Sequence, residues 1–329
     1  MKKIGKIFNI VLGIIVVSLM FFTSCEDTIE REPSPAVSSD CQNVFFTNNN
    51  VTDVELEPTD PTQVRVIISR QNSEEAATVP LKVISADSVF IIPDTVTFEA
   101  GVDTTSFVVT FPEAEEGIKY SFEIGISGDE YLNPYISDKT SIKISVIRIK
   151  WEDIGPGVMI EGIISTLFGV PELYPFYVDI QKATLPGSIT RYRLINPFKP
   201  MEAEDLDKYG IADGYPYNAP GDMLPGDFYL VIEVDAENNA SMEPQQMGFD
   251  WGYGYFTVGS IYGNISDNLS AYPLGEYDED NGVIIFPENS LFVSMANYKD
   301  GAQYPCDTPT YIYLSRDAYL AAQSANSEE

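Results

Sequence analysis

Histidine is missing from this chain of 329 residues. Its absence removes the commonest general base and the commonest metal ligand, together with every Ser-His and Cys-His nucleophile arrangement. The sequence also lacks a Gly-x-Ser-x-Gly elbow, a phosphate loop and a dinucleotide-binding glycine pattern. A carboxylate pair of the glycosidase type stays open, but with 50 Asp and Glu residues such pairs arise by chance. We therefore expect no enzyme and no cofactor.

Cysteine and basic residues are scarce. The three cysteines, Cys25, Cys41 and Cys306, show no zinc-type spacing, so no metal site is predicted. Cys41 and Cys306 lie near opposite ends of the body, which favours two independent thiols over a disulfide. Lys and Arg number 19 against 50 Asp and Glu, a net charge of −31. Such a chain repels phosphate backbones, so nucleic acid is not an expected partner.

Residues 1–24 are typical of a lipoprotein signal peptide. A basic start precedes an apolar run from Ile7 to Phe22, shorter than the roughly 20 residues of a spanning helix. A cleaved export signal is favoured, with a permanent membrane anchor as the alternative. Phe22-Thr-Ser-Cys25 resembles a bacterial lipobox with phenylalanine where leucine is usual. The resemblance implies cleavage before Cys25 and acyl chains on its thiol, which would attach the protein to a membrane.

Residues 25–43 are predicted to form a disordered linker, because Glu26–Glu32 is strongly charged and residues 33–39 are rich in Pro and Ser. An acidic run directly after the lipidated cysteine resembles the surface-export signal of Bacteroidota lipoproteins. That resemblance implies an outer-membrane protein that faces the medium. Ordinary linker charge is the alternative.

Residues 44–150 are predicted to form an Ig-like β-sandwich. Short alternating segments without helical periodicity are typical of two packed sheets. They are residues 62–69, 78–84, 105–111, 118–126 and 141–149. Ile92–Gly101, followed by Thr104–Phe111, resembles the Calx-β and related Ig-like domains of secreted bacterial proteins.

Some domains of that kind bind Ca²⁺ through acidic loops, and oxygen ligands suit this ion. The acidic residues available here are Glu113, Glu115, Glu116, Asp129 and Glu130. A solvated acidic loop is the simpler interpretation, and no metal site is predicted.

Residues 151–316 are predicted to form a second, aromatic-rich β domain of the sandwich type, which makes the whole fold all-β. Both tryptophans and 17 of the 20 tyrosines lie in residues 151–329. The expected strands are residues 175–181, 189–195, 227–234, 282–286 and 310–314, with a hairpin signal at Asn281-Gly282. Residues 317–329 should be a short helical or disordered tail, with Asp317 as the helix cap.

Three sequence segments in residues 151–329 resemble a C-terminal module of uncharacterised Bacteroidota lipoproteins: Trp151–Gly155, Arg191–Pro197 and Gly282–Pro287. The resemblance implies class and location and transfers no functional residue.

The segment Asp250-Trp-Gly-Tyr-Gly-Tyr-Phe256 places an aromatic residue at every other position. In an extended strand, Trp251, Tyr253 and Tyr255 would share one face. Phe256 and Val258 continue the apolar pattern in the opposite phase. Either a bulge near Tyr255 resets the phase and the rings are core, or one set faces outward as a ligand platform.

On the platform interpretation, Trp251, Tyr253 and Tyr255 would hold a flat ligand such as a sugar, with Asp250 making polar contacts. The loop tyrosines Tyr215 and Tyr217 would either extend the platform or fasten their loop to the body.

These features predict a lipid-anchored surface protein that acts as a non-catalytic binding module, with a glycan as the expected partner. The first alternative is a structural, adhesive or accessory protein that binds another protein. A weaker alternative is a glycoside hydrolase with two carboxyl groups about 5–9.5 Å apart.

Overall fold

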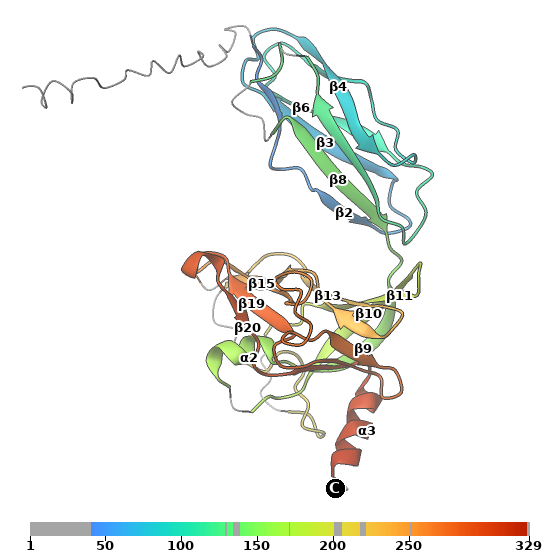
Figure 1. Cartoon of the computed structure of the whole chain (residues 1–329), viewed down its shortest axis with the longest axis vertical. Helices are drawn as coiled ribbons and strands as arrows, with labels where there is room; N and C mark the ends of the chain where they lie inside the picture. The colour runs from blue at the N-terminus through green and yellow to red at the C-terminus, as the bar shows by residue number, and fades with distance from the viewer. Residues whose placement is uncertain are drawn as a thin grey trace, which may run out of the picture.

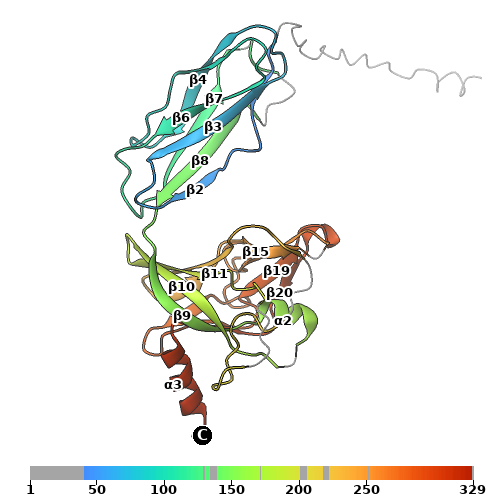
Figure 2. The same cartoon turned by 180° about the vertical axis from the view of Figure 1, so that it is seen from behind.

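A computed structural model describes residues 41–128, 130–133, 139–170, 172–200, 206–217, 222–250 and 252–327. Figures 1 and 2 show two β-rich domains that follow one another along the chain and are joined between β8 and β9. The all-β prediction is confirmed. The predicted signal peptide and Cys25 lie outside the described residues.

The N-terminal domain is a sandwich of two sheets. One sheet contains β1 (Val44–Phe46), β3 (Gln63–Arg70) and β6 (Thr104–Thr110). The other contains, in spatial order, β2 (Asp53–Leu56), β8 (Ser141–Arg148), β7 (Tyr120–Ile126), β4 (Ala77–Ala86) and β5 (Thr95–Phe98). Alternate side chains of each sheet fill the space between them, as Val66 and Ile68 of β3 and Phe122 and Ile124 of β7 do in one buried core.

The C-terminal domain is built on a closed eight-stranded barrel. In order around the barrel the strands are β9 (Glu152–Ile160), β10 (Phe176–Leu185), β11 (Ile189–Ile195), β13 (Tyr229–Val234), β14 (Asn239–Ser241), β17 (Gly275–Asp278), β18 (Val283–Phe286) and β21 (Thr310–Tyr313). Closure occurs because β9 pairs with β10 on one side and with β21 on the other. Gly157 permits the close approach, since a Cβ there would collide with the Tyr313 carbonyl oxygen.

A second antiparallel sheet packs against the barrel. Its strands, in spatial order, are β12 (Asp222–Met223), β15 (Gln245–Asp250), β16 (Tyr255–Ser260), β19 (Leu291–Met295) and β20 (Gln303–Pro305). Phe256 and Val293 of this sheet share one buried core with Ile232 and Phe286 of the barrel. The two sheets are therefore one hydrophobic unit, and the sandwich-type domain expected from the sequence is a barrel with an added sheet.

Two α-helices complete the described C-terminal domain: α2 (Ile163–Phe168) and α3 (Arg316–Asn326). The predicted tail helix therefore exists, but its cap is Ser315, whose hydroxyl accepts a hydrogen bond from the Ala318 amide at 3.1 Å. Asp317 lies in the first turn instead. No helix among the described residues is long and apolar enough to cross a bilayer. Cys41 and Cys306 are both buried and unpaired, as the sequence favoured.

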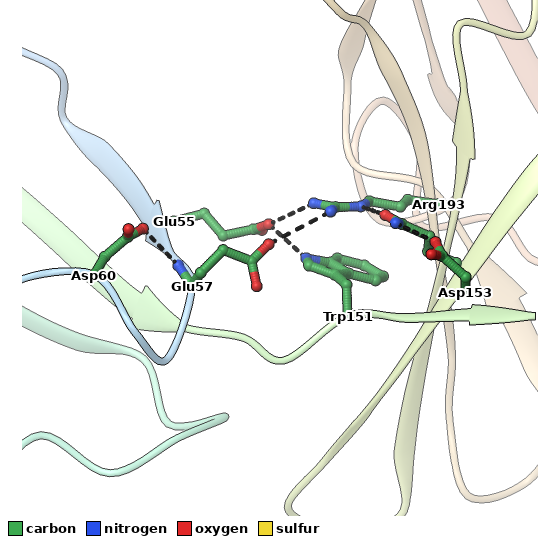
Figure 3. Close-up of polar contacts among 7 residues, drawn as sticks. Glu55, Glu57, Asp60, Trp151, Asp153 and Arg193 are labelled. Carbon is green, nitrogen blue, oxygen red and sulfur yellow. Dashed lines mark hydrogen bonds and ion pairs between the residues drawn. The ribbon is translucent and has the colours of Figure 1, made fainter.

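The junction between the domains is centred on Arg193 of β11 (Figure 3). Its guanidinium lies 4.3 Å from the ring centre of Trp151 and 4.5 Å from that of Tyr229. From the N-terminal domain, Glu55 and Glu57 approach the same guanidinium at 3.3 and 3.6 Å. The Trp151 indole also donates to Glu55 at 2.8 Å.

Apolar contacts accompany these charges. Ile147 and Ile149, at the end of the N-terminal sandwich, share a buried cluster with Ala183 and Leu185 of the barrel. The Arg193 side chain is consequently only 12% exposed. The junction is a packed interface with matched charges.

Candidate binding site

The segment Asp250–Phe256 reverses the chain between two strands. β15 ends at Asp250 and β16 begins at Tyr255, and these two residues pair across the hairpin. Gly252 and Gly254 have φ of +77° and +79°, a conformation that favours glycine. The Asp250 carboxylate accepts a hydrogen bond from the Gly252 amide at 2.7 Å and stabilises the turn. A single extended strand through these residues is therefore wrong.

The tyrosines of this turn face outward. Tyr253 is 50% exposed and Tyr255 is 44% exposed, whereas Phe256 and Val258 are fully buried. The hairpin has a register shift in β15, between Gln246 and Asp250, but it does not bring the tyrosines into the core. Tyr255 faces outward and Phe256 inward in the ordinary alternation of β16, so the set at odd positions is the one that faces outward. Trp251 lies outside the described residues.

Tyr215 is part of the core and does not belong to the exposed aromatic row. It is 2% exposed, and its ring contacts those of Phe176 and Phe198 at 5.4 and 5.6 Å. Its hydroxyl donates to the Glu161 carboxylate at 3.2 Å. The placement of Tyr215 on a ligand platform is therefore corrected: it fastens its loop to the domain.

Tyr217 lies nearer the surface and is half-buried. Its hydroxyl donates to the Glu172 carbonyl at 2.7 Å, and its ring contacts Tyr215 and Tyr174. It too connects neighbouring loops, and neither Tyr215 nor Tyr217 lines the pocket that Tyr253 lines.

That pocket, which we call the tyrosine pocket, is an open cavity of about 480 Å³ beside the second sheet. It lies among the 252–254 turn, the ends of β19 and β20, the 298–301 turn and α2. Its principal side chains are Tyr253, Tyr298, Lys299, Tyr304, Leu167 and Met295. The sequence interpretation included Tyr253 and missed the rest.

The three rings of the tyrosine pocket form a continuous series. Tyr253 and Tyr298 meet edge to face, with ring centres 5.4 Å apart, and Tyr298 and Tyr304 follow at 6.4 Å with an angle of 33° between their planes. The Lys299 ammonium lies 5.1 Å from the Tyr298 ring centre and 5.7 Å from that of Tyr304. The Tyr304 hydroxyl is buried and makes no hydrogen bond of normal geometry among the described residues. The Lys299 ammonium is its polar neighbour, and the contacts with the Tyr304 and Tyr298 side chains raise the pKa of Lys299.

The turn that carries Lys299 has an uncommon backbone. Lys299, Asp300 and Gly301 have φ of +46°, +57° and +74°, and left-handed conformations are infrequent for residues other than glycine. Hydrogen bonds from Gly301 to the Tyr298 carbonyl at 3.0 Å and from Ala302 to the Lys299 carbonyl at 3.2 Å hold the turn. Such backbone positions are often found at ligand sites.

A buried carboxylate supports the opposite wall of the tyrosine pocket. Glu161 is fully buried and accepts hydrogen bonds at 2.8 Å from the amides of Ile163 and Ile164, and at 2.7 Å from the Ser165 hydroxyl. Burial raises the pKa of Glu161, and the hydrogen bonds act in the opposite direction. Because Glu161 also accepts from Tyr215, it joins α2 to the 213–217 loop.

A second, larger cleft of about 810 Å³ lies at the outer face of β10 and the start of α3. Its charged side chains have both signs: Asp179, Asp213, Lys199 and Arg316. Only this one of the two pockets is lined by carboxylates. Within the described parts of the chain, no three His, Cys, Asp or Glu side chains gather as metal ligands would.

No family model matches the chain, and no curated protein matches it. A protein of unknown function from Bacteroides ovatus has 10% sequence identity and a TM-score of 0.29, covering 82% of this chain and 89% of that one. CBD12 from CALX1.2 has 10% identity and a TM-score of 0.25, covering 46% of this chain and 79% of that one. Likenesses of this size carry no functional conclusion, so function is argued from the chain's own geometry.

Proposed function

We propose that this protein is a lipid-anchored surface protein whose C-terminal domain binds glycans, without catalysis, in the tyrosine pocket. The observation that carries the proposal is the series of three adjacent tyrosine rings around an open cavity. The C–H faces of a pyranose pack well on such rings, and tyrosine hydroxyls can exchange hydrogen bonds with sugar hydroxyls.

The chemistry of the pocket lining supports binding over hydrolysis. Its polar side chains are tyrosines, Lys299 and Thr166, and none is a carboxylate. Glycoside hydrolysis of the usual kind needs two carboxyl groups beside the scissile bond. A sugar in this pocket would be held without a general acid.

The N-terminal sandwich has the geometry of a spacer. The described chain begins at the end of the sandwich that is remote from the C-terminal domain (Figures 1 and 2). If acyl chains are attached to Cys25, the sandwich would separate the tyrosine pocket from the membrane. The matched charges at Arg193 would hold this orientation.

The proposal is tested by screening the purified protein on an array of oligosaccharides and measuring the affinity of the hits by calorimetry. Tyr253→Ala should weaken binding by about tenfold or more, because stacking on one aromatic ring contributes about 1–3 kcal/mol when desolvated. Tyr174→Ala is the matched control, since this tyrosine is 40% exposed but does not line the pocket. Equal affinity of the wild type and a folded Tyr253→Ala variant would refute the proposal.

The second candidate is an accessory protein that binds another protein, and one feature of the N-terminal sandwich favours it. The ladder between β4 and β5 ends at Pro80 and Thr95, so the rest of β4 forms an edge. Val83 and Ile84 are about half exposed there. An extended peptide could add to this edge. Introducing Val83→Lys and testing co-purification of a partner from cells would separate this function from glycan binding.

A further inference from the structure

We infer that the tyrosine pocket selects glycans that carry a carboxylate, and that Lys299 recognises that charge. The inference rests on the proposed function and deepens it, because it specifies the class of sugar. Its basis is the placement of a cation, without an acidic partner, at the rim of an aromatic pocket.

Lys299 has no ion pair among the described residues, although the chain contains 50 acidic residues and only 19 basic ones. Among the described lysines, Lys119 and Lys150 pair with Asp53 and Glu152, whereas most of the others have no ion pair. Of these lysines, Lys299 is the one that lines the tyrosine pocket. A lysine without a carboxylate partner is free to pair with an anionic ligand.

The side chains around Lys299 leave room for that anion. No Asp or Glu lines the tyrosine pocket, so no fixed negative charge competes for the ammonium there. The ammonium lies within 6 Å of two ring centres, which places a carboxylate bound to it directly beside the rings. One sugar residue could thus stack on a tyrosine and present its carboxylate to Lys299.

The backbone fixes Lys299 in this place. Two successive non-glycine residues, Lys299 and Asp300, adopt left-handed conformations in a hydrogen-bonded turn. Such conformations are costly for residues other than glycine, which is consistent with a role in positioning the ligand-binding side chain.

The buried hydroxyl of Tyr304 supplies the second polar contact. This hydroxyl makes no hydrogen bond of normal geometry, and the Lys299 ammonium is its polar neighbour, so an anion bound to the ammonium would also lie near a hydroxyl donor. The pocket therefore offers a cation and a hydroxyl beside aromatic rings, which matches the carboxylate, hydroxyls and C–H face of a uronic or sialic acid.

Methyl esterification provides the test, because it removes the charge of the sugar and keeps its ring. The probes are oligogalacturonates, sialyl-oligosaccharides, the methyl esters of both, and neutral gluco-oligosaccharides, each titrated into the purified protein. We expect an acid form to bind about tenfold more tightly than its ester, the ratio that one charge-assisted contact of about 1.4 kcal/mol produces. Lys299→Gln should abolish this ratio, and Lys299→Arg should retain most of it.

Lys208→Gln is the matched control. Lys208 also lies over a tyrosine ring, that of Tyr209 at 4.6 Å, but does not line the tyrosine pocket. Its substitution should leave the ratio unchanged. Circular dichroism of each variant verifies the fold.

The outcomes separate this inference from the proposed function. If acids, esters and neutral sugars bind equally well, or if Lys299→Gln keeps the preference, charge recognition is refuted while glycan binding at Tyr253 stands. If no oligosaccharide of the array or of this panel binds, both are refuted.

Discussion

Two cations of this chain lie against pairs of aromatic rings, one at the domain junction and one in the tyrosine pocket. Arg193 lies 4.3 Å from the ring centre of Trp151 and 4.5 Å from that of Tyr229. It also pairs with two glutamates of the other domain (Figure 3). Lys299 lies over Tyr298 and Tyr304 and has no acidic partner among the described residues.

The partners of the two cations differ, and this difference indicates a structural role for Arg193 and a ligand-binding role for Lys299. At the junction each of the three nitrogens of the guanidinium has an acceptor or an acidic partner within the protein: Gln181, Glu55 and Glu57. The arrangement needs no ligand and serves to hold two domains. In the tyrosine pocket, the polar neighbours of the ammonium are tyrosine hydroxyls, and it has no acidic partner among the described residues. A bound ligand can supply the missing partner of such a group.

The largest change in the free energy of unfolding is expected at Glu161, because its buried carboxylate accepts several hydrogen bonds. Glu161→Ala would leave three backbone amides and two hydroxyls without their acceptor and should lower the free energy of unfolding by about 3 kcal/mol. Glu161→Gln should cost less than about 1 kcal/mol, because its oxygen can accept from the amides while its NH₂ donates to the Ser165 and Tyr215 hydroxyls, which can rotate. Urea unfolding measures both.

Glu161 should also make the stability of the protein depend on pH. Because burial raises the pKa of Glu161 above the ordinary value of 4.5, the folded protein binds a proton more tightly than the unfolded chain does. This carboxyl therefore favours folding fully below pH 4.5, and that contribution is lost as the pH rises through the raised pKa. In the Glu161→Gln variant, the free energy of unfolding should therefore depend less on pH in this range. A profile identical to that of the wild type would contradict the assignment.

A smaller effect is expected at the junction. Arg193→Ala should lower stability by about 1–2 kcal/mol, since Glu55 and Glu57 are partly exposed and solvent screens them. It should also broaden the interdomain distances seen by small-angle scattering. Arg191→Ala is the control, because Arg191 pairs at 3.0 Å with Glu233 of the same domain, on the neighbouring strand β13, and not with the N-terminal domain. Equal broadening in both variants would show that Arg193 has no special role.

The smallest expected change is an increase in stability rather than a loss. Tyr304→Phe removes a buried hydroxyl without a partner and should raise stability by about 1 kcal/mol while it weakens glycan binding. Tyr177→Phe should instead destabilise by about 1 kcal/mol, because the Tyr177 hydroxyl donates to Asp207 at 3.0 Å. Thermal unfolding compares the two. A loss of stability in Tyr304→Phe would mean that its hydroxyl is already satisfied.

The sequence was sufficient for the fold class because local alternation reports burial directly. Phe122, Ile124 and Ile126 share the buried face that their spacing predicts. Barrel closure could not be predicted, since it depends on the pairing of β9 with β21, about 150 residues apart, and alternation carries no information about partners.

The site was only partly predictable for a related reason. Gly252 and Gly254 fit a bulged strand as well as a turn, and the printed sequence does not choose between them. Tyr298, Lys299 and Tyr304 come from a different hairpin, and the available signal was the turn sequence Asn297-Tyr-Lys-Asp-Gly301 flanked by aromatic residues. That signal predicts a turn but not its proximity to Tyr253.

The closed barrel has one more consequence. Tyr253, Lys299 and Leu167 stand on two surface turns and a short helix, and no barrel strand contributes to the pocket rim. New specificities could therefore be grafted onto this scaffold by exchanging those turns, since the barrel's hydrogen-bond ladder would remain intact.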